Sequence, residues 1–183
     1  RSNRNANLTY VPAVATLEAM GAWKPRRMLA TGQKAPEFEL KDLTGRTFRL
    51  ADELAHGPVV LAFFKVDCPV CQFTFPFLER LHRNGSGTLR FYGISQDGAR
   101  STEQFNREFG VSFPTLLDEA RQGYPVSNAF GISVVPSVFL IETDGTISWA
   151  MESFRKKELE ELGTRAGAKT FLPDERVPDY RPG

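Results

Sequence analysis

Residues 59–71 read Val59-Val60-Leu61-Ala62-Phe63-Phe64-Lys65-Val66-Asp67-Cys68-Pro69-Val70-Cys71. The first eight residues form a nearly continuous apolar run of strand length, which is typical of a strand buried on both faces in a parallel sheet. Pro69 suits the first position of a helix, because its missing N–H is harmless there and its φ is already helical. The sequence therefore predicts a central strand that leads directly into a helix, with two cysteines at the junction.

Strand and helix signals alternate on both sides of this junction. A hairpin is expected before it, with strands at 38–40 and 47–50 joined by a turn at Gly45. The helix after the cysteines should end near Asn84-Gly85. Further on we expect strands at 89–95, 115–118, 137–141 and 146–150, and helices at 101–109, 126–130 and 153–162. This order implies an α/β fold in which helices flank a central mixed β-sheet and an N-terminal β-hairpin precedes it.

Three local details complete the prediction of secondary structure. Ser101 with Gln104 matches a capping box at the start of the helix expected at 101–109. Asp144-Gly145 is a hairpin turn. Phe75 is four residues after Cys71, so we expect it on the cysteine side of the helix, under a neighbouring loop and outside the Phe73/Phe77 core stripe.

The chain divides into three parts by composition. Residues 1–31 hold five basic residues and one acidic residue without sustained periodicity, and are interpreted as an N-terminal extension. Residues 32–168 carry the regular signals and form the one predicted domain. Residues 169–183 contain three prolines and are interpreted as a C-terminal tail lying on the surface.

Composition excludes several classes of function. The 183 residues are 41% hydrophobic, as in an ordinary soluble domain. The 23 Lys and Arg residues nearly balance the 22 Asp and Glu residues, so the chain lacks the excess of positive charge that attracts nucleic acid. No apolar run approaches the roughly 20 residues of a membrane span. The protein is expected to be a monomer. A signal peptide is not recognisable, but the sequence begins at Arg1 and an upstream segment can be missing. The compartment, cytoplasmic or extracytoplasmic, stays open.

The two cysteines point to chemistry. A bond between Cys68 and Cys71 would close too small a loop to stabilise the chain much, which leaves redox or metal chemistry. Free N–H groups and the helix dipole at the junction stabilise a thiolate, so Cys68 is the predicted nucleophile. Cys71, one helical turn on, can attack a mixed disulfide on Cys68 and release the partner.

A metal site is the weaker interpretation of this pair. Structural zinc takes four ligands. The only histidines are His56, on a loop, and His82, late in the helix, and neither is placed to join the cysteines. We therefore expect no metal and no cofactor.

The chain resembles the thioredoxin-like superfamily, in particular its redoxin (AhpC/TSA-like) branch of thiol-disulfide oxidoreductases and peroxiredoxin-like proteins. The resemblance covers about residues 32–165. The matching residues are Gly32-Gln33-Lys34-Ala35-Pro36-Glu37-Phe38, Leu43-Thr44-Gly45, Cys68-Pro69-Val70-Cys71, Phe75-Pro76, Asp118, residues 124–132, Val134-Val135-Pro136, Phe139-Leu140-Ile141 and Asp144-Gly145.

The resemblance implies a thioredoxin fold over residues 32–168 and a site around the two cysteines. Pro136 is expected to be cis and to face Cys68 and Cys71, while Val135 offers its backbone to an extended substrate. Pro69 and Val70 complete the expected substrate-binding residues. The implied function is a thiol-disulfide oxidoreductase that exchanges its CxxC dithiol or disulfide with protein or small-thiol substrates. An unidentified electron donor serves as the second partner.

Departures from the family pattern keep alternatives open. Asp67 places a carboxylate beside Cys68 that should oppose thiolate formation, and Thr74 stands where some relatives carry a proton-accepting Glu. A thiol-dependent peroxidase needs P-x-x-x-T-x-x-C, but Phe64 and Cys68 occupy the Pro and Thr positions. A metallochaperone or docking module is a further alternative, disfavoured by the short cysteine spacing. The direction of electron flow is undetermined.

Overall fold

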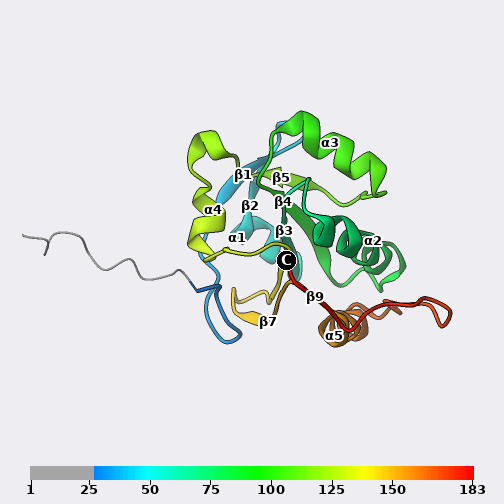
Figure 1. The fold of residues 1–183 in the computed structure, drawn as a ribbon. Coiled ribbons are helices and arrows are strands. Elements are labelled where there is room, and N and C mark those ends of the chain that lie inside the picture. The colour runs from blue at the N-terminus through cyan, green and yellow to red at the C-terminus, as the bar shows by residue number, and fades with distance from the viewer. Residues whose placement is uncertain (1–26) are drawn as a thin grey trace, which may run out of the picture.

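A computed structural model describes residues 27–183, so most of the expected N-terminal extension lies outside the described residues. Seven strands form one sheet in the order β2-β1-β5-β4-β3-β6-β7, and β8 and β9 form a separate two-stranded sheet (Figure 1). The strands are β1 Glu39–Asp42, β2 Thr47–Arg49, β3 Val59–Phe64, β4 Arg90–Ser95, β5 Thr115–Leu117, β6 Ser137–Ile141, β7 Ile147–Glu152, β8 Phe154–Arg155 and β9 Tyr180–Arg181. The helices are α1 Leu50–Leu54, α2 Pro69–Asn84, α3 Ala99–Glu108, the 3-10 turn η2 Ala120–Gln122, α4 Pro125–Ala129 and α5 Lys156–Ala166.

Strand β3 lies in the interior of the sheet, as predicted. It runs parallel to β4 and antiparallel to β6, and all six of its residues are buried. Alternate side chains enter two cores: Val60, Ala62 and Phe64 pack with α2 and α5, whereas Leu61 and Phe63 pack with α1 and α4. The mixed α/β architecture is therefore confirmed, and a strand covered on both faces explains the unbroken apolar run.

The N-terminal hairpin is confirmed and joins the main sheet. Gly45 has a φ of +84°, which only glycine adopts readily, and Asp42 accepts bonds from the backbone N–H groups of Thr44 and Arg46. β1 then pairs antiparallel with β5, so the hairpin extends the sheet beyond the parallel strands β3, β4 and β5.

Two predicted helix starts are wrong. Helix α3 begins at Ala99 with Gly98 as its N-cap, so Ser101 is already inside the helix and its hydroxyl donates to the Gly98 carbonyl instead of capping. Helix α5 begins at Lys156, three residues after the predicted start. The reason is tertiary: Phe154 and Arg155 pair with Arg181 and Tyr180, so these residues are extended before the helix begins.

The position predicted for Phe75 is also wrong. Its side chain is fully buried, with ring centroids 4.4 Å from Phe64 and 5.3 Å from Phe105. It thus packs between α2, the central strand and α3 rather than under a loop. Phe73, assigned to the core stripe, is only half-buried. The buried face of the helix is rotated toward the cysteine side because β3 and α3 lie there.

Residues 169–183 run over the surface and return toward the first turn of α2 (Figure 1). Arg80 of α2 holds Glu175 through two hydrogen bonds of 2.7 and 2.6 Å, and the Thr170 hydroxyl donates to the Leu159 carbonyl.

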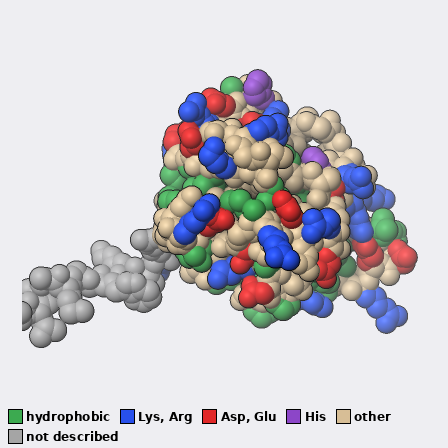
Figure 2. Space-filling model, turned by 90° about the horizontal axis from the view of Figure 1, so that it is seen from above, with side chains coloured by type: hydrophobic (Ala, Val, Ile, Leu, Met, Phe, Trp, Pro, Cys, Tyr) green, Lys and Arg blue, Asp and Glu red, His purple; other side chains and the backbone are tan. Residues whose placement is uncertain are grey.

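Among residues 27–183, no helix has the length and apolarity that a membrane span requires. Positive and negative side chains alternate over the face in Figure 2 without a single-sign patch.

Candidate active site

The two cysteines lie where β3 gives way to α2. Cys68 is the N-cap of α2, Pro69 occupies the first helical position, and the Cys71 N–H donates to Cys68 Sγ at 3.2 Å. The cysteines approach within 2.9 Å, longer than the S–S bond of about 2.05 Å, so both are free thiols. The predicted placement at the strand–helix junction is therefore seen directly.

The environment of Cys68 favours its thiolate. Its pKa is lowered to about 6, first by the hydrogen bond from the Cys71 side chain and further by backbone N–H groups of Cys71 and Val70. Partial burial and the charge of Asp67 act in the opposite direction, with Asp67 the smallest of these influences. The carboxylate flagged in the sequence thus opposes the thiolate, as expected, but is outweighed because Asp67 is exposed to water.

The environment of Cys71 has the opposite effect. Its side chain is fully buried, and burial is the main reason that its pKa is raised. Its hydrogen bond to Cys68 and the adjacent negative charge raise it further. Thr74, where a carboxylate was sought, donates its hydroxyl to the Val70 carbonyl at 2.6 Å and is not a free proton acceptor. One half-exposed thiolate therefore lies beside one buried thiol.

A loop from the other end of the domain faces Cys68. The Val135–Pro136 peptide bond is cis, which confirms the expectation, and Cys68 Sγ lies 3.4 Å from the Val135 carbonyl, to which it can donate when protonated. The Ser137 hydroxyl bonds to the Val134 carbonyl at 2.7 Å, and the Ser153 N–H bonds to the Pro136 carbonyl at 2.8 Å. These bonds hold the loop on both sides of the cis peptide.

The predicted binding residues differ in exposure. Pro69 is exposed, Val70 and Val135 are half-buried, and Pro136 is buried. The first three can be reached from solvent, whereas Pro136 cannot.

A cavity of about 410 Å³ opens beside Cys68 and Val135. Lys65 and Gln96 line it from the ends of β3 and β4, Ile132 lines it from the loop, and Gly183 closes one side. The prediction from sequence missed Lys65, Gln96 and Gly183. The first two were accessible to reasoning, because the carboxyl ends of neighbouring parallel strands meet at one edge of the sheet, whereas Gly183 carries no local signal.

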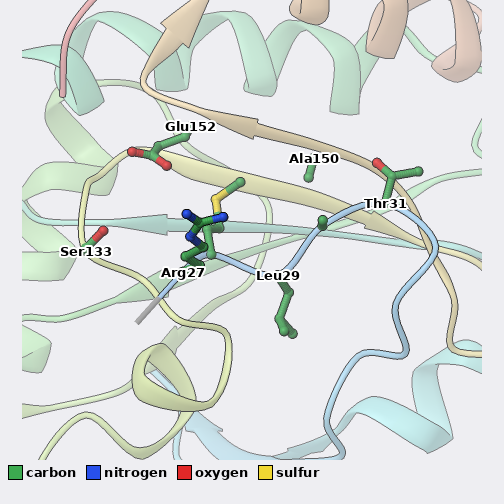
Figure 3. A pocket seen from close by; sticks show the side chains of 8 residues that line it. Arg27, Leu29, Thr31, Ser133, Ala150 and Glu152 are labelled. Carbon is green, nitrogen blue, oxygen red and sulfur yellow. The ribbon is translucent and has the colours of Figure 1, made fainter. Parts of the chain in front are cut away.

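A second cavity, of about 480 Å³, lies between the segment at residues 27–31 and strand β7 (Figure 3). Ser133 lines both cavities, and Glu152 and Arg27 line only the second. It contains no cysteine.

Within residues 27–183 no group of three His, Cys, Asp or Glu side chains is arranged to hold a metal, and His82 lies against the rings of Phe91 and Phe113.

Proteins with this architecture are well represented among known sequences and structures. Thiol-disulfide oxidoreductase ResA of Geobacillus thermodenitrificans is 31% identical over 132 residues, covering 71% of this chain and 74% of that protein. ResA of Bacillus subtilis is 28% identical over 67% of each chain. The crystal structure of peroxidoxin BcpB from Mycobacterium tuberculosis superposes with a TM-score of 0.62 at 28% identity, covering 73% of this chain and 96% of that one.

A more distant structure supports the fold alone. A putative protein disulfide isomerase from Bacteroides thetaiotaomicron has a TM-score of 0.67 at 22% identity, covering 76% of this chain and 89% of that one. The family model of AhpC/TSA proteins matches residues 31–150, which include the hairpin, both cysteines and the cis-proline loop. The chain, with its thioredoxin fold, belongs to the AhpC/TSA family.

Proposed function

We propose that Cys68 and Cys71 are the redox-active pair of this thiol-disulfide oxidoreductase, and that it exchanges electrons with disulfides and dithiols of extended protein segments and with small thiols. The observation that carries the proposal is the contrast between the two thiols. Cys68 is half-exposed with a pKa near 6, whereas Cys71 is buried and keeps its proton. At neutral pH Cys68 is therefore a reactive thiolate, whereas Cys71 is a protonated thiol that does not yet attack.

In the reducing direction, the Cys68 thiolate attacks one sulfur of a substrate disulfide. The substrate S–S bond breaks, a mixed disulfide forms on Cys68, and the leaving thiolate takes a proton from solvent. Loss of the Cys68 charge removes one of the influences that raise the pKa of Cys71. Cys71 then releases its proton and attacks Cys68 Sγ, which forms the Cys68–Cys71 disulfide and frees the second substrate thiol. A dithiol donor returns two electrons, and the same steps reversed oxidise a substrate.

The docking surface is proposed on the side of Cys68 where Val135 lies. The Val135 carbonyl is next to the attacking sulfur, so an extended chain that pairs with the Val135 backbone brings its own sulfur to Cys68. Pro69 and Val70 border the same sulfur from the helix side. Pro136 is proposed to shape this surface from beneath.

The test is to replace each cysteine and follow dithiothreitol-dependent reduction of insulin, together with mixed-disulfide formation by mass spectrometry. Cys68→Ser is expected to abolish turnover, because the nucleophile is lost. Cys71→Ser is expected to accumulate a mixed disulfide on Cys68, because resolution is lost. Unfolding midpoints of both variants provide the control for folding. Wild-type turnover in Cys68→Ser contradicts the proposal.

A thiol-dependent peroxidase is the second candidate, favoured by the similarity to peroxidoxin BcpB. Against it, Cys71, which aligns with the peroxide-attacking cysteine, is fully buried. The same proteins are therefore assayed with hydrogen peroxide. Consumption no faster than by a free thiolate of the same pKa supports the disulfide exchange function, and much faster consumption supports the peroxidase.

A further inference from the structure

Residues 177–183, which we call the strap, run from beside α5 through β9 to the chain end marked C in Figure 1, and Gly183 lines the same cavity as Cys68. The strap pairs with the body through Phe154↔Arg181 and Arg155↔Tyr180, and the Asp179 carbonyl accepts from the Lys156 N–H at 2.9 Å. The Arg181 guanidinium lies 4.0 Å from the centroid of the Phe73 ring on α2. The strap thus bridges the start of α5 and the first turns of the cysteine-bearing helix.

At its end the strap reaches the proposed docking surface. The Gly183 N–H donates to Ser153 Oγ at 3.0 Å. A Cβ placed on Gly183 would be 2.2 Å from the Val135 carbonyl oxygen and 2.7 Å from Val134 Cγ1. Only a residue without a side chain fits so close, so the backbone at 183 lies directly against the carbonyl that faces Cys68.

We propose that the strap occupies the protein-docking surface and competes with an extended substrate segment for the Val135 backbone. This inference rests on the proposed function, because it assumes docking at Val135. The strap makes backbone contact there as a foreign chain would, and the two cannot occupy the same place. Protein substrates therefore bind only to the fraction of molecules in which the strap has moved away.

The attachments of the strap suit a displaceable segment. Tyr180 is 49% exposed, and Arg181, Pro182 and Gly183 are exposed as well. The ladder of β8 and β9 is only two residue pairs long. The firmer attachment, the bidentate Arg80–Glu175 pair, precedes the strap, so residues 177–183 can leave the surface while the chain before them stays bound.

Small disulfides do not need the surface that the strap covers. Cys68 stays half-exposed with the strap in place and opens into the cavity lined by Lys65 and Gln96. A small disulfide enters there and reaches the sulfur without pairing with Val135. The strap therefore sets specificity, since it leaves small disulfides unhindered and restrains protein substrates.

The test compares the full chain with Arg181→Ala, which removes the contact with Phe73 without adding bulk. Arg176→Ala, an equivalent change at an exposed residue just before the strap, is the matched control. Reduction of insulin and of 5,5′-dithiobis(2-nitrobenzoate) is measured, with hydrogen exchange of the strap amides as the readout of release. For Arg181→Ala we expect faster exchange, a kcat/KM for insulin raised about fivefold, and an unchanged kcat/KM for the small disulfide.

Gly183→Val is the second variant, because its side chain cannot fit against Val135 and displaces the strap from another point. It should raise insulin turnover as well. Faster exchange without a gain in insulin turnover overturns the proposal, and a loss of insulin turnover shows instead that the strap helps to bind protein substrates. Failure of the proposed function itself is distinguishable, because Cys68→Ser would then still reduce the small disulfide.

Discussion

Cys68 and Cys71 are three residues apart, yet their thiols have opposite acidities. The position of Cys68 at the helix N-terminus exposes its sulfur to N–H donors, whereas Cys71, one turn on, points into the core formed by β3 and α2. The hydrogen bond between them lowers the pKa of Cys68 and raises that of Cys71. At the scale of single residues, the difference in burial thus shifts the pKa values of two chemically identical groups in opposite directions.

Alkylation should report this difference. Because the thiolate is the reacting form and the pKa of Cys68 is about 6, its rate with iodoacetamide should be half-maximal near pH 6. Below that pH the rate should fall about tenfold per pH unit, and above pH 7 it should level off. Cys71 should stay unmodified in the folded protein. Mass spectrometry assigns the label to each cysteine.

Asp67→Asn tests the sign of the neighbouring charge in the same experiment. Removing a negative charge that disfavours the thiolate should move the half-maximal pH to a lower value. Asp52→Asn, on the distant helix α1, is the control and should leave the profile unchanged. A half-maximal pH near 9 in the wild-type protein would show that Cys68 is an ordinary thiol.

At the scale of elements, α2 is fixed against the sheet by its aromatic residues. Phe75 contacts Phe64 of β3 and Phe105 of α3, and Leu78 and Leu81 continue the same buried face. On the other side Phe73 and Phe77 lie against Phe154. These contacts determine where the N-terminus of α2, and with it Cys68, lies relative to the cis-proline loop.

Truncation of Phe75 should therefore be costly. Phe75→Ala removes a fully buried ring and is expected to lower the free energy of unfolding by about 3–5 kcal/mol. Leu172→Ala, at a side chain 48% exposed, is the control and should change it by less than about 0.5 kcal/mol. Urea denaturation of the reduced proteins measures both. Equal midpoints for the two variants would place Phe75 outside the core.

At the scale of the whole molecule, the candidate active site lies where distant parts of the chain meet. The end of β3, the cis-proline loop 67 residues after Cys68, and the strap contribute to one surface. Charge is nearly balanced overall and both signs mix on the face in Figure 2. We therefore expect partner choice to depend on local shape and backbone contacts rather than on a long-range field.

This balance predicts a weak dependence on ionic strength. Raising the salt concentration from about 0.05 to 0.5 M should change kcat/KM for insulin by less than about twofold, because no field of one sign steers the encounter. The kcat/KM of the small disulfide serves as the reference. A steep decrease with salt, seen for insulin alone, would reveal an electrostatic docking patch that the overall charge conceals.

The sequence alone determined the central strand, the helix that follows it and the cysteines at their junction, because apolar periodicity and the chemistry of Pro69 act locally. It also carried the family motif that places Pro136 in a cis bond. The predictions of Ser101 as a capping residue, of Phe75 under a loop and of the start of α5 were wrong, because contacts with residues distant in the sequence outweigh local propensity there. Only the tertiary structure decided that Cys71 is buried, that the Val135 carbonyl lies 3.4 Å from Cys68 Sγ, and that the Gly183 backbone lies against that carbonyl, because burial and contacts between residues far apart in the chain arise from packing and leave no local trace.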